Sequence, residues 1–419
     1  MIGTGPGTLL AGRNITPVQR VGWSFIAAYV IAYLGMWMAL LSPILVGLTR
    51  RTEHIDAAHA TANLSLILGL GALVALVANP VFGHLSDLTR SRYGTRGLWL
   101  TGGAAAGVLG LTLVALAQTT LQLLLGWCLT QLAFNAEIAA LAALLADHVP
   151  RQQRGTVSGI TSVSLPVGMV LGTFLVQALD TSVLASFVVP ALIALAGATV
   201  LALRLPRAAR TQRPARTPLR HIFWLSPRHF PDFGWTWCSR FLMFSGVAVL
   251  MAYQGLYLIQ QLGYTADQLP RLIFLATLVQ ATSHAIIGLA GGWLSDRLQR
   301  SRVFIIAAAL IYCAALLVIA FATSYGAFLL GVGLAGAGQG LYVAVTRSLA
   351  VNVLPERELH AAKNLGIFNI ADTSPQFLMP ALASAILLLS VANYTLLFVV
   401  AATATALSAM AIRRVTGVH

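Results

Sequence analysis

Long apolar stretches separated by short polar segments follow one another along the whole chain. Each stretch is about 20 residues or longer, the length that an α-helix needs to cross a bilayer. The ten-residue alternation of a barrel strand is absent. The pattern predicts an all-α integral membrane protein with twelve spanning helices. These helices are expected at residues 21–48, 61–84, 98–117, 120–147, 155–178, 183–205, 231–260, 268–293, 302–322, 326–354, 360–388 and 391–413.

The polar segments indicate an internal duplication. The phrase Gly-x-Leu-Ser-Asp begins at Gly83 and again at Gly292, 209 residues later, and arginines follow each copy. A second pair of similar segments contains Pro150 and Pro355, which lie 205 residues apart. Two parallel repeats of about 200 residues are typical of one group of secondary transporters. We therefore expect an N-terminal six-helix bundle at 1–205, a basic cytoplasmic linker at 206–230 and a C-terminal six-helix bundle at 231–419.

Composition and charge agree with this interpretation. The chain is 58% hydrophobic and 9% charged, whereas soluble domains are about one quarter charged. Of the 26 Lys and Arg residues, 21 fall in the termini and the even-numbered connections, while Arg50, Arg51 and Arg271 fall on the opposite side. This bias predicts that both termini are cytoplasmic, and we expect the membrane to be a bacterial inner membrane. The net charge of +14 thus reflects topology and contact with lipid headgroups, not a nucleic-acid partner.

Twelve helices in two halves, with this charged phrase after helices two and eight, resemble the major facilitator superfamily. The segment from Asp87 to Trp99 is similar to that of the glycoside-pentoside-hexuronide symporters and the sucrose transporters. The resemblance implies alternating access and a cytoplasmic latch between the halves. Alternatively, these arginines only set the topology. The implied latch residues are Asp87, Arg90, Arg92, Arg96, Asp296, Arg297 and Arg300.

Few ionisable side chains lie within the predicted helices away from their ends, and the candidates are Glu137, Arg240, His284, Arg347 and Asp372. A charge at the bilayer centre costs about 3 kcal/mol or more, so such residues usually face a cavity or a partner. The resemblance implies that helices one, four, seven and ten line the pathway. We expect Glu137 and Asp372, with Arg240, to couple transport to protons, and His284 and Arg347 to contact the solute. The alternative is a fixed structural ion pair.

Aromatic and amide side chains recur on the same pathway helices. Rings between amides are suited to holding sugar-like solutes, although aromatic stripes in membrane helices also serve packing. The expected binding residues are Tyr29, Tyr33, Trp37, Gln131, Asn135, Tyr253, Gln254, Tyr257, Gln339 and Tyr342, together with His284 and Arg347.

Helix two offers polar side chains such as Asn63, Ser65 and Asn79 but no acid, whereas the melibiose permease group binds its cation with acids on that helix. This departure favours protons or uncoupled facilitation over sodium. Asp372 is not expected in sugar-permease relatives, which weakens the sugar assignment.

The sequence thus predicts a monomeric, proton-coupled transporter of a small polar solute, with a sugar or glycoside first. No metal, cofactor or catalytic residue is expected. The alternatives are an efflux carrier for an amphipathic compound or lipid, a non-transporting receptor and a membrane-embedded enzyme.

Overall fold

The computed structural model describes residues 21–89, 96–150, 153, 157, 160–161, 163–205, 231–298, 300–353, 361–390 and 393–415. The long elements in these ranges are helices, in agreement with the predicted all-α class. In the first half they are α1 (Trp23–Ser42), α2 (Leu48–Asp56), α3 (Ala60–Leu88), α4 (Gly97–Leu116), α5 (Thr120–His148), α7 (Ser164–Ala178) and α8 (Val183–Leu203). In the second half they are α9 (Pro231–Leu256), α10 (Leu269–Leu298), α11 (Ser301–Ala320), α12 (Tyr325–Val353), α13 (Ala361–Leu389) and α14 (Tyr394–Arg413).

The predicted number of spanning helices is confirmed. Within the described residues, nine segments are long and apolar enough to cross a membrane, and the first of them, Trp23–Ser86, contains both α1 and α3. The shorter α7 and the helix α13 complete the twelve. The first helix continues past its expected end at residue 48 into α2, because Thr52 bonds back to the carbonyls of Leu48 and Thr49 and the Arg51 guanidinium reaches the carbonyl of Ala117.

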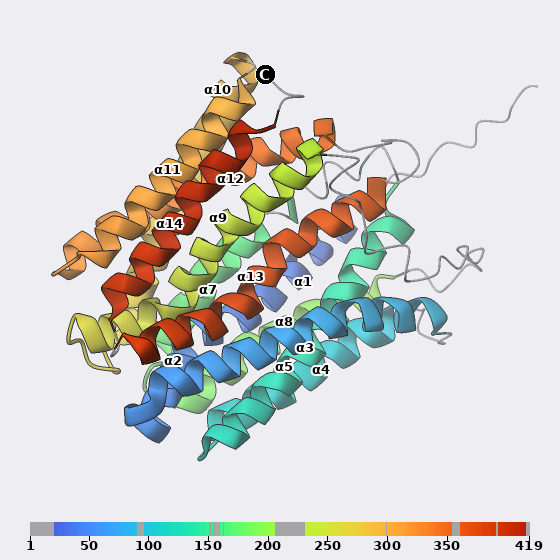
Figure 1. The fold of residues 1–419 in the computed structure, drawn as a ribbon. Helices are drawn as coiled ribbons and strands as arrows, with labels where there is room; N and C mark the ends of the chain where they lie inside the picture. Colours follow the sequence, from blue (N-terminus) through green and yellow to red (C-terminus); the bar gives the residue numbers. More distant parts are fainter. Residues whose placement is uncertain are drawn as a thin grey trace, which may run out of the picture.

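The two halves repeat the same helix pairing, as the duplicated sequence predicts. In the first half α1 packs on α7 and α8, α4 packs on α5 and α8, and α3 packs on α5. In the second half α9 packs on α13 and α14, α11 packs on α12 and α14, and α10 packs on α12. The halves meet where α13 lies beside α3 and α10 beside α7, and Figure 1 shows the blue-to-green and yellow-to-red groups joined there.

Glycine permits the closest of these helix contacts. A Cβ on Gly35 of α1 would lie 2.8 Å from the Cα of Ala194 in α8, and one on Gly340 of α12 would lie 2.2 Å from the carbonyl oxygen of His284 in α10. In a bilayer, helix association depends on such close packing, because lipid tails are as apolar as the helix surfaces.

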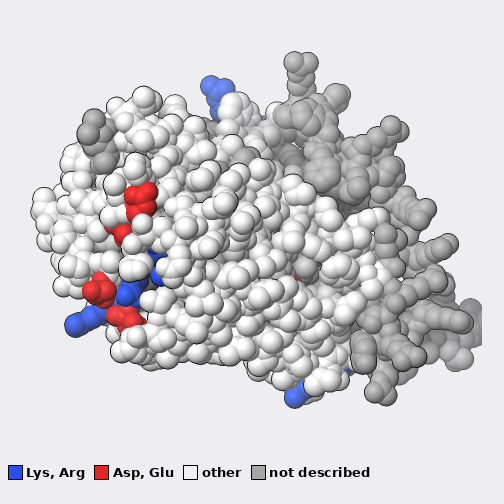
Figure 2. Space-filling model, turned by 90° about the horizontal axis from the view of Figure 1, so that it is seen from below, with Lys and Arg blue, Asp and Glu red and all other residues white. Residues whose placement is uncertain are grey.

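Among the described residues, one cluster of charged side chains lies at the end of the molecule opposite to most of the arginines. We call it the arginine-poor end, and define it by the connections at 48–59, 117–119, 179–182, 262–268 and 321–324 and by residues 390 and 393. Figure 2 shows Lys, Arg, Asp and Glu side chains clustered at the left, beside a broad surface without them. An uncharged belt of this kind is the surface that faces lipid.

The first helix of each half contains a π-helical turn near the arginine-poor end. These turns are η1 (Pro43–Gly47), between α1 and α2, and η4 (Tyr257–Gln261), which follows α9. A π turn holds more residues than an α turn, so it changes which residues of the following turn face a neighbour. Both turns directly precede or contain polar residues that contact the other half.

Candidate functional site

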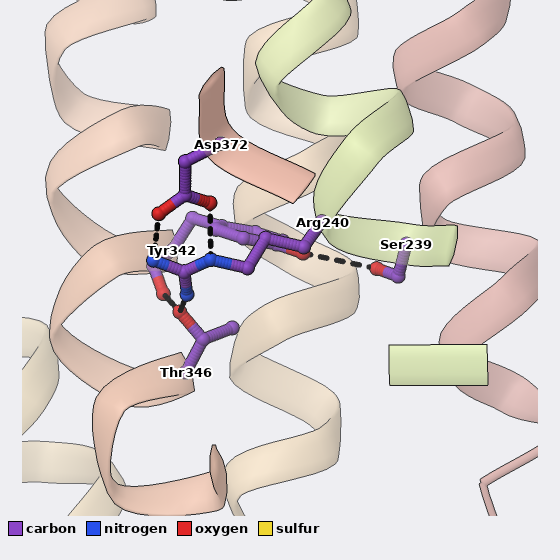
Figure 3. Close-up of polar contacts among 5 residues, drawn as sticks. All are labelled: Ser239, Arg240, Tyr342, Thr346 and Asp372. Atoms are coloured by element: carbon purple, nitrogen blue, oxygen red, sulfur yellow. Dashed lines mark hydrogen bonds and ion pairs between the residues drawn. The ribbon is translucent and has the colours of Figure 1, made fainter. Parts of the chain in front are cut away.

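The most extensive polar contact among the pathway helices centres on Arg240 of α9 (Figure 3). Its Nε and Nη2 donate to the two carboxylate oxygens of Asp372 on α13, the Nη2 bond being 2.8 Å long. Its Nη1 donates to Thr346 Oγ1 of α12 over 3.1 Å. The guanidinium also lies 5.4 Å from the ring centre of Phe244. The forked pair is the strong geometry for arginine and carboxylate, and it joins three helices of the second half.

A layer of hydroxyls lies beside this pair. The Tyr342 hydroxyl is 3.0 Å from Ser239 Oγ, which is 2.9 Å from Ser408 Oγ, and Thr346 Oγ1 donates to the Tyr342 carbonyl. Tyr342 is fully buried. The Arg240 and Asp372 side chains retain 11% and 21% of their exposure, so solvent or solute can still reach the pair.

Glu137 occupies a different environment. It lies on α5, its side chain is fully buried, and within the described residues neither carboxyl oxygen has a hydrogen-bond partner. Gly103 of α4 allows the close approach, since a Cβ there would lie 3.3 Å from the Cβ of Glu137. An isolated carboxylate is costly in such a site, which therefore favours the neutral, protonated acid.

The predicted amide residues of α5 form one cluster. The Asn135 side-chain nitrogen donates to the Gln131 carbonyl at 2.8 Å and approaches Gln131 Oε1 at 3.4 Å. Asn79 of α3 reaches Asn135 Oδ1 at 3.5 Å. Gln131 and Asn135 are buried and Asn79 is half-buried, so the cluster lies along the contact of α3 with α5.

The aromatic residues predicted on α1 do lie on one face. The Tyr29 and Tyr33 rings meet edge to face at 5.1 Å, and Trp37 packs near Gly168 of α7. Tyr29 is buried and its hydroxyl donates to the Leu141 carbonyl at 2.7 Å. Tyr33 and Trp37 are half-buried. Tyr29 is therefore part of the helix packing, whereas Tyr33 and Trp37 each keep some solvent-accessible surface.

The predicted residues on the second half's first helix separate into two environments. The Tyr253 hydroxyl lies 2.5 Å from Ser65 Oγ of the other half and donates to the Pro380 carbonyl. The Tyr257 hydroxyl donates to the Ile319 carbonyl at 2.6 Å, inside the second half. Gln254 is buried between them along the helix.

Three predicted solute contacts remain. His284 on α10 and Gln339 on α12 are half-buried, and the backbone of His284 packs against Gly340. The side chain of Arg347 lies outside the described part of the chain. In the described residues no group of His, Cys, Asp and Glu side chains is arranged to hold a metal ion.

The predicted latch region is described in part. Arg96 is buried at the start of α4, where its Nε donates to Asp147 at 2.9 Å and its Nη1 to Ser86. In the second half Arg297 stacks 5.3 Å over the ring of Trp293, and Arg300 is exposed just before α11. Arg90 and Arg92, and the side chains of Asp87 and Asp296, lie outside the described residues.

His148 follows Asp147 at the end of α5, beyond the spanning segment, and its ring stacks on Phe25 at 6.3 Å. Burial of the imidazole lowers the pKa of His148, and the charge of Arg96 lowers it further, against the opposite effect of Asp147.

Several residues of these clusters were not predicted from the sequence. Asn79 was noted only for the polarity of helix two, and Ser239, Thr346 and Asp147 were not singled out. Asp147 had a usable signal, since it is an acid near the end of a helix, close to the basic loops. Ser239 and Thr346 had none, because hydroxyls are common in membrane helices and bond to their own backbone.

Comparison with known proteins gives one consistent result. A family model described as Major Facilitator Superfamily matches residues 25–288 and 237–417. No curated protein sequence matches the chain significantly.

Solved structures share the fold at low sequence identity. A bacterial homologue of the human lysosomal transporter Spinster, in an inward-facing and occupied conformation, has a TM-score of 0.70 and 13% identity, covering 93% of this chain and 95% of that one. The nucleoside transporter NupG has a TM-score of 0.72 and 10% identity, covering 93% and 99%. The human organic anion transporter MFSD10 has a TM-score of 0.65 and 16% identity, covering 93% and 99%.

Proposed function

Because the chain belongs to the Major Facilitator Superfamily, we propose that it moves a small polar organic solute by alternating access and that the movement is coupled to protons. Membership in this superfamily makes it a multi-pass membrane transporter and not an enzyme. The direction of transport, the solute and the coupling ion are parts of the proposal.

The different states of the two intramembrane acids support proton coupling. Asp372 is held by a forked ion pair with Arg240, so its charge is compensated. Glu137 is buried with no hydrogen-bond partner among the described residues, and a carboxyl group in that state binds a proton. A carrier that binds a proton in one conformation must release it in another. On this proposal, Glu137 gains a polar or aqueous environment when the helices rearrange.

The test is Glu137→Gln in proteoliposomes. We expect this neutral variant to lose accumulation of solute under a proton gradient but to keep exchange of solute across the membrane, because a permanently neutral site reorients only when loaded. The matched control is Cys128→Ser, a change on the same helix at a residue that has no part in the proposed solute or proton site. If Glu137→Gln accumulates solute like the parent protein, this residue does not carry the proton.

A sugar or glycoside remains the first candidate for the solute, supported by the amide cluster of Gln131, Asn135 and Asn79. One observation favours the second candidate, an efflux carrier for an amphipathic compound or lipid. The rings of Tyr29, Tyr253 and Tyr257 are buried and their hydroxyls already bond to protein groups, so they offer no free donor to a sugar. A thermal-shift screen of sugars and amphipathic compounds distinguishes the two, since a ligand at 100 times its Kd stabilises by about 2.7 kcal/mol.

We also propose the predicted orientation, with both termini cytoplasmic in a bacterial inner membrane, a monomer as the working unit, and bundles at 1–205 and 231–419. The arginine-poor end then faces outward, and its contacts between the halves correspond to a conformation closed to the outside. The latch assigned to Asp87, Arg90, Arg92, Arg96, Asp296, Arg297 and Arg300 belongs to the opposite, cytoplasmic end.

A further inference from the structure

Two of the three arginines at the arginine-poor end have identified bonds there. The positive-inside bias leaves only Arg50, Arg51 and Arg271 on this side, and basic residues that oppose the bias need another reason to be present. Arg51 donates to the carbonyl of Ala117, the residue that follows α4. Arg50 contacts both halves of the molecule.

Arg50 of α2 forms an ion pair within its own half and also contacts an acidic residue of the other half. It forms an ion pair with Asp180, in the turn between α7 and α8. Its Nη2 lies 3.4 Å from Oδ1 of Asp267, which precedes α10 in the second half. The Arg50 side chain is only 17% exposed, whereas Asp267 is 92% exposed. Asp180 thus positions the guanidinium, and Asp267 is the partner that can leave.

A second cluster centres on Gln260 in the π turn η4. Its amide nitrogen donates to Glu53 of α2 at 2.9 Å. Its amide oxygen accepts from Thr61 of α3 at 3.2 Å and from Tyr394 of α14 at 2.8 Å. Thr61 and Tyr394 also lie 3.2 Å apart across the two halves. One neutral side chain therefore uses both its donor and its acceptor to connect the first half with the second.

We propose that these two clusters form an extracellular gate: Arg50 with Asp180 and Asp267, and Gln260 with Glu53, Thr61 and Tyr394. The gate holds the arginine-poor end closed, and its contacts between the halves must break before the transporter opens outward. The inference rests on the proposed alternating-access function, because it takes separation of the halves at this end as a step of the cycle.

Solvent exposure sets the strength of the gate. Exposed ion pairs and hydrogen bonds contribute little individually because water competes with them. A gate that opens in every cycle requires this weakness, since strongly bonded halves would not separate. A groove of about 610 Å³ lies along the same boundary, with Gln177 and Asp180 on one wall and Asp267, Gln268 and Arg271 on the other, so solvent reaches the contacts.

The experiment measures the separation of the halves directly in the full-length protein. Spin labels are placed at Thr181 and Gln268, both exposed and on opposite halves, after replacement of Cys128, Cys238 and Cys313. Distances between the labels are then recorded by pulsed electron paramagnetic resonance. The parent protein should populate mainly the short distance of the closed end.

Charge reversal tests the first cluster, and an isosteric change tests the second. Asp267→Lys places a positive charge beside Arg50, and Gln260→Glu places a negative charge beside Glu53. Each should raise the ratio of long to short distances by about fivefold or more, the lower end of typical couplings between sites. Asp267→Asn, which only removes attraction, should have a smaller effect. The Asp267 and Gln260 side chains are both exposed, so folding should be preserved.

The matched control is Asp56→Asn, at the same end of the molecule. Among the described residues, Asp56 bonds only to His59 and Asn63 of its own half, so the distances should not change. If Asp267→Lys and Gln260→Glu leave the distances as in the parent protein, the gate is wrong. Solute counterflow, recorded separately, decides the transport function, so failure of either proposal is recognised independently.

Discussion

At the scale of single residues, the buried acids illustrate two ways of keeping a carboxyl group within a membrane. Asp372 has a partner that can match both of its oxygens, and the desolvation of the two charges is offset by their attraction. Glu137 has no partner in the described residues and is compatible with its surroundings only as the neutral acid. The two acids should therefore respond differently when their charge is removed.

We predict that Asp372→Asn destabilises the protein and that Glu137→Gln does not. The first change takes from Arg240 the carboxylate that binds it, and breaking a buried ion pair costs about 3 to 5 kcal/mol. The second replaces a protonated acid by a side chain of the same shape. Thermal unfolding in detergent, followed for both variants beside the parent protein, measures the difference. Equal losses of melting temperature would mean that Glu137 is also held as a charged group.

At the scale of helices, glycine determines how closely the two halves meet. Gly255 of α9 lies against Thr49 of α2, which belongs to the other half. A Cβ at Gly255 would come 2.9 Å from the Thr49 hydroxyl and 3.2 Å from its Cβ. Rotation of the Thr49 side chain does not move its Cβ and therefore cannot relieve the 3.2 Å contact. The two helices must move apart to accommodate a methyl group at Gly255.

We predict that Gly255→Ala opens the arginine-poor end. The overpacking costs about 1 to 3 kcal/mol, and it is relieved when the halves separate. The same pair of spin labels at Thr181 and Gln268 should therefore show more of the long distance. Gly102→Ala is the control, because an added methyl group at Gly102 of α4 meets no atom within 4 Å. If Gly255→Ala lowers the melting temperature but leaves the distances between the labels unchanged, the overpacking is relieved by movement within one half, and the prediction is wrong.

At the scale of the whole molecule, the two halves are separately packed units joined along few helices. Each half contains its own set of matching helix pairs, and between the halves α3 meets α13 and α7 meets α10. A membrane helix pair does not need a covalent connection to associate, since packing in the bilayer suffices.

We predict that the chain can be divided within 206–230 without loss of assembly. Residues 1–205 and 231–419, expressed together as separate chains, should copurify through a tag on one of them and should restore the melting transition of the intact protein. Either half expressed alone should give a lower melting temperature. Failure of the two to copurify would show that the linker contributes more than a connection.

The fold was predictable from the sequence because the bilayer fixes the length of each span and the repeated charged phrase fixes the order of the halves. The positions at which the helices end were less predictable. The extension of the first helix to Asp56 and the π turns depend on contacts with distant segments. Similarly, the sequence indicated that Arg240 and Asp372 lie in the membrane, but not that Thr346 completes their site, because hydroxyl side chains carry no distinctive pattern.

The equal lengths of α5 and α12 allow the residues at equivalent positions of the two halves to be compared. Both helices have 29 residues, and their first residues, Thr120 and Tyr325, are 205 positions apart, the same offset as that of Glu137 and Tyr342. The same place in the two copies thus holds an ionisable acid in one and a hydroxyl engaged with Ser239 in the other. On the proposed mechanism, only the first copy of this position binds the coupling proton, so the second copy was free to acquire a different side chain during evolution.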